Sequence, residues 1–126
     1  MTVGTDFAWL NTQGVRIAPR LDGTVLRLTM SGSVDGRDPG AVFDPYWTTV
    51  DQAARREGIT EIELDIRELE YMNSSGLLTL VRWLMKVREQ TAYAIVIRYD
   101  RDHTWQKTSV PVLAKLAPGV VRVVQP

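Results

Sequence analysis

The sequence contains no cysteine and only one histidine, His103. The absence of cysteine excludes disulfides, thiolate catalysis and cysteine-based zinc sites. A single histidine excludes a histidine-rich metal site. The glycine-rich loops Gly-x-Gly-x-x-Gly and Gly-x-x-x-x-Gly-Lys-Ser/Thr are also missing, so the usual nucleotide-binding motifs are absent. The sequence therefore predicts neither a metal nor a cofactor.

No excess charge of either sign is present, since 15 Lys and Arg residues balance 15 Asp and Glu residues. This balance argues against binding nucleic acid through a general basic field. No apolar run approaches the roughly 20 residues of a membrane-spanning helix. Residues 1–6 lack the basic and apolar segments of a secretory signal. We therefore expect a cytoplasmic protein that binds neither nucleic acid nor membrane.

The chain contains enough apolar sequence for one folded domain. Of its 126 residues, 44% are hydrophobic and 24% are charged, which is ordinary for a globular protein. A chain of this length buries roughly two-thirds of its unfolded surface. We expect a lead-in over residues 1–12, with some apolar residues that can dock, and one domain over residues 13–126.

Strand and helix patterns alternate after an initial hairpin. Residues 15–17 and 25–30 flank the turn residues Asp22 and Gly23, which is typical of an antiparallel hairpin, and Pro19 favours an edge position for the first strand. Further along, we expect a loop over 31–40, a helix with Asp44 as N-cap and Pro45 in its first turn that stops near Gly58, a strand over 59–66, a helix over about 74–90, a strand over 93–99, a loop over 100–108, a helix over 110–116 and a strand over 120–124. This order predicts an α/β fold whose sheet is parallel or mixed, with right-handed crossovers and helices on one face or both.

The most informative segment places two serines, Ser74 and Ser75, at the expected start of a helix, followed by Gly76. A helix N-terminus offers unpaired backbone N–H groups and a partial positive charge. A hydroxyl at this position can carry a phosphate whose charge the helix end tolerates. Helix capping is the commonest use of such residues, and residue chemistry alone favours that simpler interpretation.

Residues 64–66 (Leu-Asp-Ile) and 73–77 (Asn-Ser-Ser-Gly-Leu) resemble the motif of the STAS domain family. That motif is an apolar-Asp-apolar strand followed by Asp-Ser-Ser/Thr-Gly-Leu at a helix start. Residues 31–35 (Ser-Gly-Ser-Val-Asp) resemble the family's Gly-x-Leu-Asp segment, and the resemblance extends over about residues 25–124. It implies a mixed, mostly parallel sheet of four to five strands with an N-terminal hairpin and about three flanking helices.

The resemblance is to STAS domains of the anti-sigma factor antagonist type, and it implies a bacterial partner switch that regulates transcription. In that family, a kinase with the histidine-kinase-like ATPase fold phosphorylates the first serine of the motif, and a PPM-type phosphatase removes the phosphate. The unphosphorylated form binds the kinase and releases its other target, often a sigma factor. By position, Ser74 matches the phosphorylated serine, with Ser75 as the less favoured site. The implied partner-binding residues are Asn73, Ser74, Ser75, Gly76, Thr79 and Trp83.

Asn73 departs from the family motif, which has an acidic residue at this position. Asparagine caps a helix as well as aspartate does, but the negative charge is lost. The helix tail over residues 82–88 (Arg-Trp-Leu-Met-Lys-Val-Arg) is also unusual and suggests a different partner. A second hypothesis is therefore a STAS scaffold that is never phosphorylated, or a homodimeric interaction module.

A helical wheel places the core face of this helix on one arc of about 180°. Trp83 lies at the border of that arc, where packing at the core margin is favoured over a role as an exposed interface anchor. The residues on the arc are Leu77, Leu78, Leu80, Val81, Leu84, Met85 and Val87.

Other candidate residues have simpler structural interpretations. Asp65 is expected to bond backbone groups at a strand end rather than to bind a metal, and Glu68 and Glu70 to form a solvated acidic edge beside the partner surface. The aromatic residues Phe43, Tyr46 and Trp47 are expected in the core or in a dimer contact. A hydrolase using Ser74 or Ser75 would need His103 as its base and lacks a Gly-x-Ser-x-Gly elbow, so we expect no enzymatic activity.

Overall fold

The structure is a computed structural model that describes residues 7, 9–12, 14–90 and 92–125. Its six strands form one sheet in the order β1-β2-β3-β4-β5-β6. Strands β1, β2 and β3 are antiparallel, whereas β3 to β6 are parallel. The elements are β1 (Leu10–Thr12), β2 (Val15–Asp22), β3 (Val25–Val34), α1 (Pro39–Arg56), β4 (Glu61–Met72), α2 (Ser74–Gln90), β5 (Ala94–Arg98), α3 (Thr104–Leu116) and β6 (Val121–Val124). The predicted mixed α/β fold is confirmed, with six strands in place of four to five.

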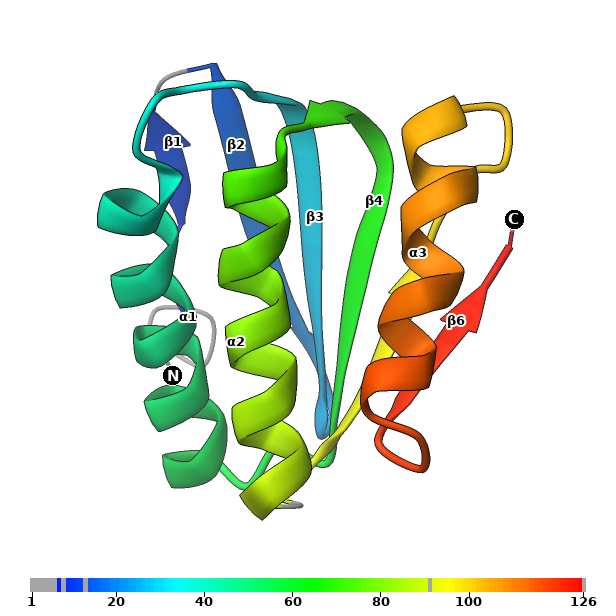
Figure 1. The fold of residues 1–126 in the computed structure, drawn as a ribbon. Coiled ribbons are helices and arrows are strands. Elements are labelled where there is room, and N and C mark those ends of the chain that lie inside the picture. The colour runs from blue at the N-terminus through cyan, green and yellow to red at the C-terminus, as the bar shows by residue number, and fades with distance from the viewer. Residues whose placement is uncertain (1–6, 8, 13, 91, 126) are drawn as a thin grey trace.

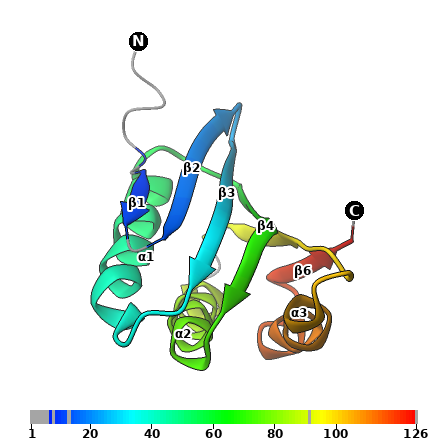
Figure 2. The ribbon, with the colours of Figure 1, turned by 90° about the horizontal axis from the view of Figure 1, so that it is seen from above.

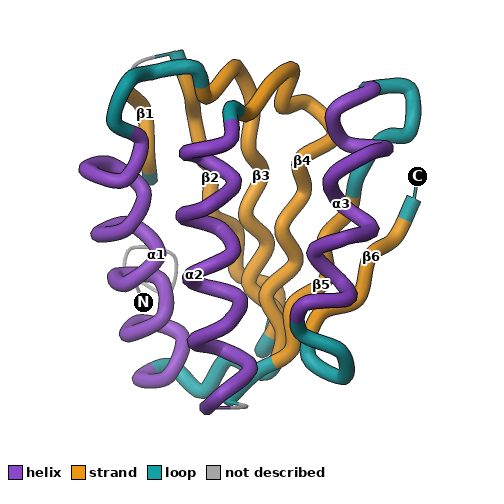
Figure 3. Tube along the Cα trace, in the orientation of Figure 1, coloured by secondary structure: helices purple, strands orange, loops and turns teal. Residues whose placement is uncertain are grey.

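All three helices cover the same face of the sheet. Figure 1 shows α1, α2 and α3 side by side in front of the strands, and Figures 2 and 3 agree with this arrangement. The parallel strands advance across the sheet in one direction, and right-handed crossovers in one direction place every helix on one face. The fully buried Leu26, Leu28 and Leu64 alternate with Arg27 and Glu63, as expected when one strand face supports a core. No helix in the described ranges has both the length and the apolar character needed to cross a bilayer.

The hairpin forms as predicted, with Asp22 paired to Val25 and Gly23 at a positive φ of 64°. The edge position expected of β2 is wrong, because β2 lies between β1 and β3. However, β1 pairs only with residues 15–17 of β2. Pro19 lies beyond that short ladder, so its missing N–H disrupts no bond on the β1 side.

Helix α1 begins six residues earlier than predicted. The chain has two Asp-Pro pairs, and the helix starts at the first, with Asp38 at the N-cap position and Pro39 in the first turn. Pro45 lies inside the helix, where a proline removes one helical hydrogen bond. The early start buries Pro39 and Phe43, two residues that a helix beginning at Pro45 would not contain. The predicted stop is confirmed, since α1 ends at Arg56 and Gly58 has a φ of 69°.

Strands β3 and β4 both extend further than predicted. The expected loop over residues 31–40 is shortened, because residues 31–34 continue β3 and pair with residues 68–72 of β4. Two register shifts between these strands interrupt the simple alternation that marks a strand in sequence. As a result, only Asn73 separates β4 from α2.

Helix α3 also begins six residues earlier than predicted, at Thr104, so Pro111 lies in its interior. Tertiary contacts explain this early start. The Gln106 side chain is fully buried, and its Nε2 donates to the backbone oxygens of Ile66 at 2.7 Å and Leu69 at 2.9 Å. Its Oε1 accepts from the Asp100 N–H at 2.8 Å. Because glutamine is polar, the hydrophobic pattern of the sequence does not indicate that Gln106 fixes α3 to β4.

Candidate protein-interaction site

The carboxyl ends of β3, β4 and β5 lie at one edge of the sheet, at the top of Figure 1. Each of these strands leads into the N-terminus of a helix, α1, α2 or α3 respectively. In α/β folds this edge is where ligands and partners commonly bind. Ser74 is the first residue of α2 and therefore lies at this edge.

Asn73 joins two elements through one side chain. Its Oδ1 accepts a hydrogen bond from the Gly76 N–H at 2.8 Å, which caps α2. Its Nδ2 donates to the Gly36 carbonyl at 2.9 Å, which fixes the loop between β3 and α1. The Asn73 N–H also donates to the Val34 carbonyl at 2.9 Å. An aspartate could cap the helix, but a carboxylate cannot donate to Gly36.

Gly76 permits α2 to approach the ends of β3 and β4 closely. A Cβ at this position would lie 2.8 Å from Cγ1 of Val34, 3.0 Å from Cγ of Met72 and 3.3 Å from Oδ1 of Asn73. These distances are shorter than van der Waals contact. The glycine of the Asn-Ser-Ser-Gly motif is therefore required by packing rather than by an unusual backbone angle.

The two serines are both exposed on the first turn of α2. No described residue forms a hydrogen bond to either hydroxyl. The unpaired N–H groups and partial positive charge of the helix start favour an anionic group at this position. The geometry therefore leaves both hydroxyls accessible for modification.

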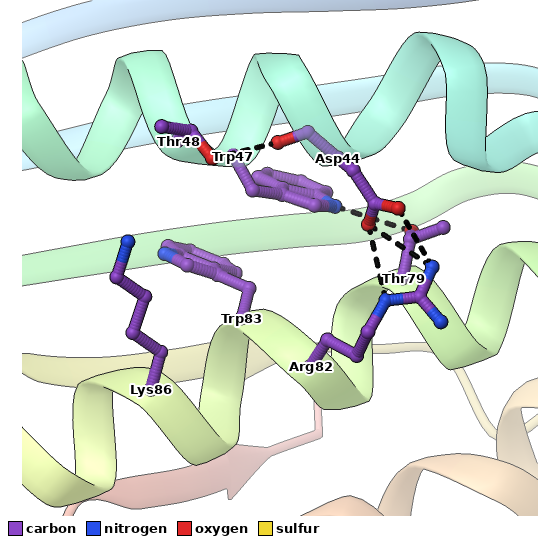
Figure 4. Close-up of a pocket in the computed structure, with 7 residues that line it drawn as sticks. All are labelled: Asp44, Trp47, Thr48, Thr79, Arg82, Trp83 and Lys86. Atoms are coloured by element: carbon purple, nitrogen blue, oxygen red, sulfur yellow. Dashed lines mark hydrogen bonds and ion pairs between the residues drawn. The ribbon is translucent and has the colours of Figure 1, made fainter.

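The side chains of Thr79 and Trp83, both on α2, are buried, with only 2% and 3% of their surface exposed. The Thr79 hydroxyl donates to the Gly76 carbonyl at 2.8 Å and accepts from Nε1 of Trp47 at 3.3 Å. The Trp83 and Trp47 rings are stacked with centroids 4.5 Å apart (Figure 4). Trp83 is thus a core residue, the interpretation that the helical wheel favoured. Because so little of either side chain is accessible, we expect Thr79 to position the first turn of α2 through its bond to Gly76, and Trp83 to hold α2 against α1.

Two exposed apolar side chains near Ser74 were not recognised from the sequence. Leu78 was predicted to lie in the core, but it is 53% exposed, and Tyr71 is 47% exposed. Helix α2 buries Thr79 and Trp83 against α1 instead, which turns Leu78 toward solvent. Leu78 follows Ser74 by one turn on the same helix face. Tyr71 lies near the end of β4, three residues before Ser74 in the chain, and tyrosine is enriched in protein interfaces.

A cleft of about 300 Å³ lies between α1 and α2 (Figure 4). The Arg82 guanidinium spans the helices and contacts both carboxylate oxygens of Asp44, at 2.8 and 3.1 Å. The residues that line the cleft include Asp44 and Trp47 of α1 and Thr79, Arg82, Trp83 and Lys86 of α2.

Asp51 is a buried carboxylate behind this cleft, with 3% exposure. It accepts from the Tyr93 hydroxyl at 2.6 Å and from Nε of Arg55 at 3.1 Å. The Tyr93 oxygen in turn accepts from Nε1 of Trp83 at 3.3 Å. Burial and the bond to Asp51 raise the pKa of Tyr93. This network connects α1, α2 and the start of β5 and has the character of a structural support.

Asp65 accepts the Arg67 N–H at 3.1 Å, which confirms its predicted bond to a nearby backbone group, although β4 continues beyond it. Its carboxylate also pairs with the Arg67 guanidinium at 2.7 Å. Burial alone would raise the pKa of Asp65, but the Arg67 hydrogen bonds and the charges of Arg67 and Arg98 outweigh burial and lower it below 3.8. Glu68 and Glu70 are exposed near the end of β4, as expected for a solvated acidic edge.

Among residues 7, 9–12, 14–90 and 92–125, neither a hydrogen-bonded pair of His103 with Ser74 or Ser75 nor a metal-ligating cluster is present. No described hydrogen bond joins His103 to Ser74 or Ser75, and His103 instead precedes α3. No group of three or more His, Asp or Glu side chains is placed to hold a metal ion there. The aromatic side chains Phe43, Tyr46 and Trp47 are buried against one another, consistent with a core role.

Comparison with known proteins identifies the fold. No protein-family model matches the sequence, and no curated protein matches it. An anti-sigma factor antagonist from Mycobacterium paratuberculosis has a similar structure, with 15% identity, a TM-score of 0.63 and coverage of 86% of this chain and 85% of that chain.

Two further solved structures are similar. The crystal structure of the diguanylate cyclase SiaD in complex with its activator SiaC from Pseudomonas aeruginosa contains a chain with 18% identity, a TM-score of 0.70 and coverage of 94% of this chain and 99% of that one. A Shewanella loihica protein with a SpoIIAA-like fold gives 15% identity, a TM-score of 0.55 and coverage of 91% and 88%. The six-stranded sheet, N-terminal hairpin and three helices described above are thus those of a divergent STAS, or SpoIIAA-like, fold.

Proposed function

We propose that this protein is a regulatory protein-binding module, not an enzyme, whose partner binding is controlled by phosphorylation of Ser74. The observation that carries this proposal is the exposed Ser74 hydroxyl on the first turn of α2, with exposed Leu78 one turn away. The similar solved structures support a binding role, since one is an anti-sigma factor antagonist and another contains an activator in complex with its enzyme.

A phosphate on Ser74 would act on the partner rather than on the fold. It adds about −1.5 to −2 charges at neutral pH. At a helix N-terminus this charge stabilises the helix by about 0.3–1 kcal/mol. The same charge in an interface must be paired or desolvated, and each 1.4 kcal/mol of cost weakens binding about tenfold. A modest electrostatic cost is therefore enough to release a partner.

The partners in this proposal are separate proteins, because the chain has no ATP-binding motif. A kinase of the histidine-kinase-like ATPase fold would phosphorylate Ser74, and a PPM-type phosphatase would reverse the reaction. The unphosphorylated chain would bind the kinase in the cytoplasm. Ser75 is the alternative phosphorylation site, since it is also exposed on the first turn.

The direct test is the phosphorylation state of the protein isolated from its source cells. Intact-mass analysis before and after phosphatase treatment, followed by peptide mapping, should show one phosphate at Ser74. Ser74→Ala should abolish it, and Ser75→Ala should leave it in place. Parallel capture with wild-type and Ser74→Asp baits should then yield an ATPase-type kinase on the wild type alone.

Asn73 supports a second candidate, a STAS scaffold or homodimer that binds independently of phosphorylation. Its side chain is committed to Gly36 and Gly76 and provides no carboxylate beside Ser74 to assist phosphate transfer. Protein without phosphate under all growth conditions, together with equal capture by both baits, would favour this candidate over the first.

A further inference from the structure

Helix α2 presents one row of exposed side chains from Ser74 to the cleft beside α1. Ser74, Leu78, Arg82 and Lys86 follow one another at intervals of four residues, and all four are exposed. Residues four apart form a ridge on the surface of a helix, and such ridges are the usual contact element in helix packing. The row therefore consists of an accessible serine at the helix start, an exposed leucine one turn later and two cationic side chains beyond it.

The two cations give the cleft an excess of positive charge. Its lining contains Arg82 and Lys86 against one carboxylate, Asp44. Arg82 is paired with Asp44, whereas the Lys86 ammonium has only a 3.9 Å contact with Asp51. Asp51 already accepts from Tyr93 and Arg55, so Lys86 contributes little to satisfying that carboxylate.

Five of the 15 acidic residues of the chain lie on another element, strand β4. Strand β4 has five carboxylates against one arginine over residues 61–70. Of these, Glu63 is held between Arg27 at 3.0 Å and Arg98 at 3.1 Å. The described lining of the α1–α2 cleft thus carries two cations against one carboxylate, an excess of one positive charge on a chain of zero net charge.

We infer that the α1–α2 cleft and Leu78 together bind an acidic segment of a protein partner, with an apolar side chain on Leu78 and carboxylates on Arg82 and Lys86. Two cations on one ridge are complementary in charge to an acidic segment. The inference deepens the proposed function, on which it rests for the role of Ser74, by specifying the chemistry of the partner.

The helix geometry also explains how a phosphate would weaken this contact. At 1.5 Å per residue, Ser74 lies about 6 Å along the axis from Leu78, about 12 Å from Arg82 and about 18 Å from Lys86. The screening length at physiological salt is about 8 Å. Of these three residues, only Leu78 lies within one screening length of Ser74, so a phosphate on Ser74 would repel the carboxylates of the segment near Leu78 and act only weakly on the contacts at Arg82 and Lys86.

The first arm of the test maps the bound segment. A photo-crosslinking amino acid, p-benzoylphenylalanine, replaces Leu78 in the full chain, and the chain is crosslinked in lysate of the source cells. The crosslinked peptide is then identified by mass spectrometry. An adduct whose peptide contains at least two carboxylates near the crosslink supports the inference. An adduct lacking carboxylates, or no adduct, overturns it.

The second arm measures binding of the purified crosslinked protein. The double variant Arg82→Gln/Lys86→Gln should bind at least about tenfold more weakly and show a shallower salt dependence. The charge-preserving Lys86→Arg and the distant exposed Arg122→Gln should both bind as wild type. Wild-type affinity in the double variant overturns the inference. If that variant melts early, Lys86→Gln alone, which loses only the 3.9 Å contact, decides the outcome.

The two proposals fail in distinguishable ways. If Ser74→Asp weakens binding but Arg82→Gln/Lys86→Gln does not, the inference of an acidic segment is contradicted and the phosphorylation switch is retained. If binding depends on Arg82 and Lys86 but no phosphate is ever found on Ser74, the phosphorylation switch is contradicted and the inference of an acidic segment is retained.

Discussion

The side chain of Asn73 donates a hydrogen bond to the carbonyl of Gly36 at 2.9 Å. The same side chain caps α2 by accepting from the Gly76 N–H. The loop after β3 and the first turn of α2 are therefore positioned by one amide. The replacement of the acidic residue in the STAS motif is thus a change in hydrogen bonding as well as in charge.

Asn73→Asp should lower the free energy of unfolding by about 1 kcal/mol or less. It loses the bond to Gly36, worth about 1 kcal/mol, but its charge gains about 0.3–1 kcal/mol at the helix N-terminus. Asn73→Ala loses both bonds and should cost about 2 kcal/mol. Urea denaturation measures both, with the exposed Asn11→Asp as the control. Equal stability of the wild type and Asn73→Ala would contradict the two-bond arrangement.

Gly76→Ala should destabilise the protein by about 1–3 kcal/mol, because the added methyl group overlaps Val34 and Met72. The higher helix propensity of alanine, about 1 kcal/mol, opposes this effect. Gly40→Ala is a matched control, since the nearest atoms to its Cβ belong to the flexible ends of Asp44, Asp38 and Arg82. Thermal melting should separate the two variants, and a neutral Gly76→Ala would show that this helix start is loosely packed.

If the proposed function holds, Ser74→Asp should weaken binding of the proposed kinase partner at least about tenfold and leave the melting temperature nearly unchanged. An acidic residue in the first turn is favourable for the helix, so the effect must act through the partner. Ser75→Asp provides a matched charge one residue away. Calorimetric titration gives the affinity and differential scanning gives the stability. A large fall in melting temperature would exclude a mechanism that acts only on the partner surface.

The pKa of Asp65 is lowered in the folded protein, which predicts a specific pH dependence. A carboxyl with a lowered folded pKa contributes stability above its unfolded pKa and loses that contribution as the pH falls through the folded value. The stability advantage of the wild type over Asp65→Asn should thus be full at about pH 6 and shrink below about pH 4. Urea midpoints across this range measure it, with the exposed Asp102→Asn as the control. A pH-independent difference would mean that Arg67 does not favour the ionised form.

Tyr93→Phe should destabilise the protein by about 1–3 kcal/mol, since it removes a donor to the buried carboxylate of Asp51 and an acceptor for Trp83. Tyr71→Phe, on an exposed residue, should have an effect close to zero. Chemical denaturation of both variants tests this comparison. Similar losses in the two would indicate that the Asp51 network contributes little net stability.

Much of the fold follows from local patterns in the sequence. The alternation of Ile62, Leu64 and Ile66 with charged residues indicates the start of β4, and Ser74 with the apolar residues after it predicts α2 with the observed bounds. The order of elements is enough to give the mixed α/β class, because parallel strands joined by helices permit few topologies.

The starts of α1 and α3 could not be predicted, because distant contacts determine them. Two Asp-Pro pairs offer two starts for α1, and the structure uses the one that buries Pro39 and Phe43. Helix α3 begins at Thr104, where Gln106 bonds two carbonyls of β4. Register shifts conceal the second half of β4, which the predicted strand over 59–66 did not include.

The sequence by itself determined the chemistry of the site, and tertiary structure decided which side chains are accessible. The motif predicts Ser74, Ser75 and Gly76 at a helix start, because the capping residue and the helix periodicity are local signals. The helical wheel could not determine that Trp83 stacks on Trp47 while Leu78 faces solvent. The rotation of a helix about its axis depends on the helix beside it, and α1 contributes Trp47 from 36 residues earlier in the chain.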